Sequence, residues 1–143
     1  MTVYFFSSPY DVLNNWSAHA VTVWGKSFNT VEHAYHYAKF TTVRPDIARQ
    51  IMAAPSPWAA MQLAKKYNDL PEHTWHNKKV AVMEELLRAK LSQNKDVADR
   101  LSATGTRTII ENSPWDTFWG CGSDGTGLNT LGKLWVKLRD KIK

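Results

Sequence analysis

The stretch "SPWDTFWGCGSDGTGLNTLGKLW", residues 113–135, holds five of the chain's seven glycines. Two of the seven tryptophans, Trp115 and Trp119, lie within the five residues before the first of these glycines. Glycine permits positive φ and close backbone approach, whereas tryptophan offers a large flat surface. We therefore expect an ordered, functional loop rather than a simple surface turn. We call residues 113–129 the glycine segment.

Around this segment the chain alternates short strand patterns with amphipathic helices. The expected strands are residues 3–6, 20–24 with a turn at Gly25-Lys26, and 107–111. The expected helices are residues 31–41, 45–52, 57–67, 74 or 77 to 93, 94–103, and 129–142. Three of them have cap residues: Thr30, Ser56 and Asn94. The last two long helices have apolar stripes: Val80, Met83, Leu87 and Leu91, and then Leu128, Leu131, Leu134, Trp135, Leu138 and Ile142. The pattern predicts a compact α+β fold, mostly helical with a few short strands.

Bulk properties agree with one domain over residues 1–143. The chain contains a single cysteine and shows neither a leader pattern nor a long apolar run, so we expect a cytoplasmic protein. The net charge of +5 favours an anionic partner such as a nucleotide, a sugar phosphate or nucleic acid. The excess is concentrated in the last helix, where a solvated helix face is the simpler interpretation.

The helix predicted at 31–41 carries an unusual polar edge. At about 100° per residue, Glu32, His36 and Lys39 fall within roughly 60° of one another. A carboxylate at the second helical position is favoured in its ionised form by the helix dipole. Such a group suits stabilisation of a developing cation or orientation of a water. The alternative is a solvent-facing ladder with a weak Glu32–His36 pair.

The glycine segment suggests a nucleotide site. Its glycines, leading into a helix near Asn129, predict unpaired amides at a helix N-terminus, where a phosphate binds well. Trp115 and Trp119 could stack on a base, with Asp116 near the sugar. In the alternative, Asp116 and Asn129 are only turn or cap residues.

Other motifs are absent. The histidines show no metal-ligand spacing, and neither a P-loop nor a G-x-G-x-x-G dinucleotide fingerprint occurs.

Several stretches together resemble the NADAR superfamily of YbiA-like N-glycosidases. "TVEHAYHYAKF" (30–40) resembles the family's T-x-E-H-x-[FY]-Q-x-x-K helix, and "WHNKKVAVM" (75–83) resembles W-x-x-x-K-x-x-V-M. "DTFWGCGSDGTGLNTLG" (116–132) resembles D-x-[FY]-W-G-x-G-x-x-x-G-x-N-x-L-G. "NNWS" (14–17) resembles an early S-N-F element, with Asn14 and Trp16 replacing its Ser and Phe. His36 stands where the family usually has Gln.

The resemblance implies a mainly helical α+β fold and hydrolysis of N-glycosidic bonds without a metal or cofactor. Family substrates include ribosylamino intermediates of riboflavin synthesis and ADP-ribose attached to guanine in DNA. By position, the implied catalytic residues are Glu32 and Asp116. The implied substrate-binding residues are Trp75, Trp119, Asn129, Lys39, Asn15, His36, Gly120, Gly122, Gly125 and Gly127. Water attack and a covalent Glu32 intermediate both remain open.

Two other functions stay open at the level of sequence. One is a module that binds ADP-ribose or an NAD-like ligand without cleaving it, and the other is a basic nucleic-acid binder. The pair Glu32 and Asp116 favours an enzyme over the first, because a binding module needs stacking and phosphate contacts but no paired carboxylates. Among substrates, the positive charge favours an ADP-ribosylated nucleotide or nucleic acid.

Overall fold

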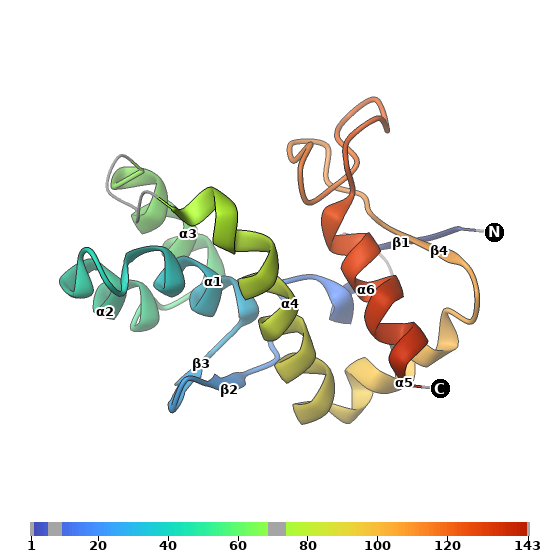
Figure 1. Ribbon diagram of the computed structural model, residues 1–143, viewed down its shortest axis with the longest axis horizontal. Helices are drawn as coiled ribbons and strands as arrows, with labels where there is room; N and C mark the ends of the chain where they lie inside the picture. The colour runs from blue at the N-terminus through green and yellow to red at the C-terminus, as the bar shows by residue number, and fades with distance from the viewer. Residues whose placement is uncertain (1, 6–9, 69–73, 143) are drawn as a thin grey trace. The chain divides into compact units, whose positions relative to one another are not determined.

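The computed structural model describes residues 2–5, 10–68 and 74–142 (Figure 1). The elements in chain order are β1 (Thr2–Phe5), η1 (Asp11–Leu13), β2 (Val21–Val23), β3 (Lys26–Phe28), α1 (Val31–Phe40), α2 (Pro45–Met52), α3 (Pro57–Lys66), α4 (Trp75–Gln93), α5 (Lys95–Ala103), β4 (Thr108–Glu111) and α6 (Thr130–Lys141). The expected α+β class, rich in helices and poor in strands, is confirmed. The chain divides into two compact units. We call residues 18–93 the α1 unit, and residues 1–17 with 94–143 the α6 unit. A single domain over 1–143 stays a prediction.

In the α1 unit, α1 packs against α2, α3, α4 and β3. Its apolar side, with Val31 and Phe40 fully buried, explains this central place. The expected caps are confirmed for two helices: Thr30 Oγ1 accepts from the His33 amide at 3.2 Å, and Ser56 Oγ from the Ala59 amide at 3.0 Å.

A β-hairpin in the α1 unit was only half predicted. β2 pairs antiparallel with β3 through a turn in which Trp24 and Gly25 both have positive φ, 56° and 73°. Two consecutive residues with positive φ form a two-residue hairpin turn whose backbone twist matches the right-handed twist of the two strands. The strand β3 was missed because three residues, of which only Phe28 is buried, show no alternation that a sequence pattern can detect.

In the α6 unit, β1 and β4 form a parallel pair with Val3 opposite Ile109. The helix α6 packs on β4, and Gly132 makes this approach possible, since a Cβ there would overlap the carbonyl oxygen of Ile109. Trp135 is fully buried in α6 and donates from Nε1 to the Leu13 carbonyl at 2.9 Å. The expected strand residue Phe6 lies outside the described residues.

Several expected core positions are wrong. Val80 is 37% exposed: α4 buries Trp75 in its first turn and Met83 in its middle, and residues 76–78, 80 and 81 between them are exposed. Leu128 and Ile142 are 55% and 46% exposed, since they precede and follow α6 rather than continue its stripe. Asn94 occupies the N-cap position of α5 without a side-chain capping bond. None of the described helices has the length and apolar character needed to cross a membrane.

Candidate active site

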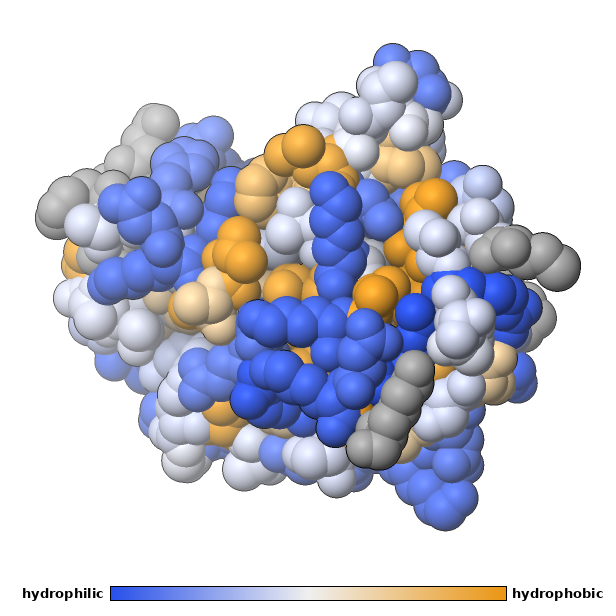
Figure 2. Space-filling model, turned by 45° about the vertical axis from the view of Figure 1, so that its right-hand side comes forward, coloured by the Kyte–Doolittle hydropathy of each residue, from blue (hydrophilic) through white to orange (hydrophobic). Residues whose placement is uncertain are grey.

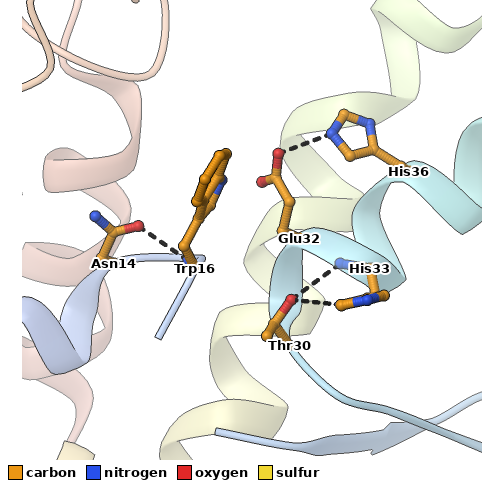
Figure 3. Close-up of polar contacts among 6 residues, drawn as sticks. All are labelled: Asn14, Trp16, Thr30, Glu32, His33 and His36. Carbon is orange, nitrogen blue, oxygen red and sulfur yellow. Dashed lines mark hydrogen bonds and ion pairs between the residues drawn. The ribbon is translucent and has the colours of Figure 1, made fainter. Parts of the chain in front are cut away.

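The polar edge of α1 is a buried pair rather than a solvent-facing ladder. Thr30 caps the helix, which puts Glu32 in its first turn and His36 one turn later (Figure 3). His36 Nε2 lies 2.8 Å from Glu32 Oε2, and the two side chains are only 8% and 12% exposed. The expectation of a weak, solvated i, i+4 pair is therefore wrong. Burial strengthens a charged hydrogen bond of this kind.

His36 has one nitrogen committed and one that is buried without a partner. An ionised carboxylate can only accept, so the Nε2 that faces Glu32 carries a hydrogen. Nδ1 is buried and has no hydrogen-bond partner among the residues that the structure describes. A buried polar atom of this kind calls for an explanation such as a bound water or ligand.

An aromatic and a cationic side chain adjoin this pair. Tyr35 lies 5.3 Å from the His36 ring and 5.2 Å from the Trp75 ring, measured between centroids. Lys39 Nζ lies 5.1 Å from the Tyr35 ring centroid. Burial lowers the pKa of Lys39, while the charge of Glu32 acts in the opposite direction and Lys79 adds to the lowering. The structure thus brings Glu32, His36, Lys39 and Trp75 into one group of contacts and charges in the α1 unit.

The glycine segment belongs to the α6 unit, and Asp116 shapes its first turn. Asp116 Oδ1 accepts from the amides of Phe118 and Trp119 at 2.9 and 2.7 Å. The turn-forming role is therefore present, and it uses one carboxylate oxygen only. Trp119 is half-buried against Phe118, edge to face at 4.8 Å. Trp115 is 78% exposed, so the two tryptophans lie in different surroundings.

The predicted phosphate cradle of unpaired amides is wrong for most of the segment. The amides of residues 121, 122 and 125–131 all donate within the chain. In particular, those of Thr130 and Leu131, at the start of α6, bond the carbonyls of Phe118 and Trp119 at 3.0 and 3.1 Å. The segment's own backbone thus occupies the helix N-terminus that was expected to hold an anion.

The glycines serve this folding of the segment on itself. A Cβ at Gly127 would lie 2.5 Å from the Gly120 carbonyl oxygen, and one at Gly120 would lie 2.7 Å from Glu111 Oε2. Gly122 and Gly125 adopt φ of 71° and 79°. The tip, residues 123–126, is the longest fully exposed run of the segment. Figure 2 shows a mainly hydrophilic projection at the top of the molecule.

Asn129 joins the segment to the neighbouring strand. Its Oδ1 accepts from the Glu111 amide and its Nδ2 donates to the Ile109 carbonyl, both at 2.9 Å. It stands before α6 with φ 53° and makes no capping bond to the helix. The structure gives Asn129 a bridging role that the sequence motif did not reveal. Asn15, also expected at the site, is buried in the same unit.

Sequence reasoning overlooked Glu111, which was treated only as a strand residue. Its side chain is buried, 9% exposed, and its carboxylate lies against Gly120. The available signal was an acidic residue ending a strand just before the glycine segment, which is unusual for a buried position. Among the described residues no group of three His, Cys, Asp or Glu side chains could hold a metal ion.

Comparison with known proteins supplies the family. The model of the NADAR domain matches residues 4–143. The chain belongs to the NADAR family. The resemblance seen in the sequence is thereby confirmed, and three relatives extend it.

The first relative is the N-glycosidase Npun_R5314 of Nostoc punctiforme, 34% identical over all of this chain and 94% of the relative. The NADAR chain is also 30% identical to the N-glycosidase YbiA of Escherichia coli K12, with 97% of this chain and 86% of the relative aligned. The NMR structure of E. coli YbiA matches with a TM-score of 0.89 and 29% identity, covering 99% of this chain and 84% of that one. The riboflavin biosynthesis protein VVA0006 of Vibrio vulnificus is 32% identical, and this chain spans 38% of its length.

Proposed function

We propose that this NADAR protein is an N-glycosidase that hydrolyses the bond between a ribosyl carbon and a nitrogen base. The observation that carries the proposal is the buried Glu32–His36 pair in the first turns of α1. The names of the relatives, two of which are N-glycosidases, support the reaction type. The net charge of +5 supports a phosphate-bearing substrate.

The chemistry requires a fixed negative charge. When the C1′–N bond breaks, the base leaves with the electron pair and positive charge develops on the ring oxygen and C1′. A preorganised carboxylate stabilises this charge most effectively where water is excluded. Glu32 meets both conditions, since its side chain is 12% exposed and its position in the first turn favours the ionised form. We assign Glu32 to oxocarbenium stabilisation and to orientation of the attacking water.

Asp116 is the second carboxylate of the proposal. Its Oδ1 is used by the turn, so Oδ2 is the oxygen left to bond ribose hydroxyls or to assist departure of the base. We assign Trp75 and Trp119 to stacking on the base and Lys39 to phosphate. The amides of residues 121, 122 and 125–131 are not assigned to phosphate, because they donate within the chain. Asn129 acts by holding the segment on β4.

Two substrate classes follow from the proposal. ADP-ribosyl guanine, free or in nucleic acid, and phosphoribosylamino pyrimidines each present a ribose C1′–N bond next to phosphate. The name of the Vibrio vulnificus relative supports the second class. The positive charge of this chain supports the first, in which more phosphate groups are available.

The test is product analysis by mass spectrometry after incubation with a panel of N-ribosyl compounds from both classes. We expect release of the base by the wild type and a loss of about 10³-fold in kcat for Glu32→Gln, comparable to removal of one electrostatic stabiliser. Glu84→Gln is the matched control, because Glu84 pairs with Arg88 on α4 of the same unit. A folded Glu32→Gln variant with full activity removes the assignment. If the protein binds these compounds tightly and they are recovered intact, it is a binding module rather than an enzyme.

A further inference from the structure

The Glu32–His36 pair has a property that the proposed chemistry leaves unused. Glu32 needs its full negative charge to stabilise an oxocarbenium ion, yet its closest recorded partner is a side chain that can become positively charged. A neutral imidazole donates a hydrogen bond and leaves the pair with a net charge of −1. An imidazolium in the same place cancels that charge.

The site of the second proton is defined by the geometry. Nε2 faces Glu32 Oε2 at 2.8 Å and already carries a hydrogen, so a further proton enters at Nδ1. Nδ1 is buried and has no acceptor among the described residues to receive a new N–H. The neutral ring presents a lone pair there instead, which can accept a hydrogen bond from a substrate hydroxyl or a water.

We propose that His36 is a positioning residue that orients Glu32 through Nε2 and makes the reaction depend on a neutral imidazole. In this form the pair is a carboxylate held by a neutral donor. Protonation at Nδ1 converts it into an internal ion pair, which no longer stabilises positive charge on the sugar and can no longer accept a bond at Nδ1. The inference rests on the proposed N-glycosidase function of the same site.

The surrounding charges fit this arrangement. The charged groups recorded around the pair come from two helices: Glu32 and Lys39 on α1, and Lys79 on α4. Burial lowers the pKa of Lys39, the negative charge of Glu32 raises it, and the positive charge of Lys79 lowers it further. A proton on His36 therefore adds a positive charge beside Glu32, whose charge already acts on the ammonium group of Lys39. Tyr35 packs against the His36 ring and offers no charge to balance it.

The kinetic test is the pH profile of kcat/KM for wild type, His36→Gln and His36→Phe. Wild type should lose activity tenfold per pH unit on the acid side of one transition, as expected when a single protonation removes activity. His36→Gln should lose less than tenfold at neutral pH, because an amide also donates to Glu32, and its acid limb should move down to the range of a carboxylate. His36→Phe, which lacks the donor, should lose at least a hundredfold at neutral pH, and its acid limb should move down as in His36→Gln. His76→Gln, an exposed histidine on α4, is the matched control and should keep the wild-type profile.

A second readout does not depend on turnover. Nitrogen NMR of the His36 ring should show the tautomer with hydrogen on Nε2, and Glu32→Gln should shift its titration. If the wild type cleaves no N-ribosyl compound, the proposed function fails, and these spectra still decide the state of the pair. A hydrogen on Nδ1 in the neutral ring, or an acid limb in His36→Gln that superimposes on that of the wild type, overturns the inference.

Discussion

Replacement of Asn129 separates a bridging role from a substrate-binding one. In Asn129→Ala the Glu111 amide and the Ile109 carbonyl both lose their partner. A buried backbone group left without a hydrogen bond costs about 1–3 kcal/mol. Alanine must also hold the left-handed φ of 53° at a cost of about 1 kcal/mol. We therefore expect a loss of roughly 3–7 kcal/mol, a large part of the ~5–15 kcal/mol typical of a domain.

Two further variants at this position divide the loss into its causes. Asn129→Gly relieves the backbone strain but not the lost bonds, so it should be about 1 kcal/mol more stable than Asn129→Ala. Asn129→Asp keeps the acceptor for Glu111 N but turns an oxygen towards the Ile109 carbonyl, and it should resemble Asn129→Ala.

The assay is urea unfolding of the wild type and all three variants, and the free energies are compared where the dependence on urea concentration has the same slope. The kcat and KM are then measured under conditions in which each variant is folded. If Asn129→Ala unfolds within about 1 kcal/mol of wild type while its KM rises strongly, the bridge is unimportant and the side chain serves the substrate. That result refutes the reasoning.

Three other predictions concern the glycine segment and Lys39. Gly127→Ala should destabilise strongly, because its Cβ meets backbone atoms of residues 120 and 121, whereas Gly125→Ala, with open space around it, should cost only about 1 kcal/mol of φ strain; thermal unfolding of the pair checks this. Asp116→Asn keeps the acceptor for the two amides of its turn, so its melting temperature should stay near that of wild type while the rate of hydrolysis falls about 10²-fold. A fall in melting temperature that accounts for the lost activity would show that the carboxylate serves the turn alone. The pKa of Lys39 is lowered, so between that pKa and 10.5 the unfolded chain binds more protons and the free energy of unfolding should rise with pH. Denaturant titrations should show this rise in wild type and not in Lys39→Met.

Local patterns determined most of the secondary structure. Thr30 sets the start of α1, and Ser56 followed by Pro57 sets that of α3, because these residues satisfy or avoid unpaired end groups without help from distant parts of the chain. The family motifs likewise placed Glu32 and the glycine segment on the correct elements. Exposure at Val80 and Leu128 was mispredicted, since helical periodicity says which residues share a face but not where a neighbouring element stops.

Tertiary structure decided what the candidate residues do. The spacing of Glu32 and His36 allowed a solvated pair. Only packing around α1 buries it and leaves Nδ1 without a partner among the described residues. The glycines permitted an anion cradle, but the carbonyls that accept from the segment's amides belong to residues up to eleven positions away along the chain. Asn129 looked like a helix cap until its side chain was found bonded to β4. In each case the sequence determined which groups are available, and the fold determined their partners, because hydrogen bonds and burial depend on residues that local patterns do not bring together.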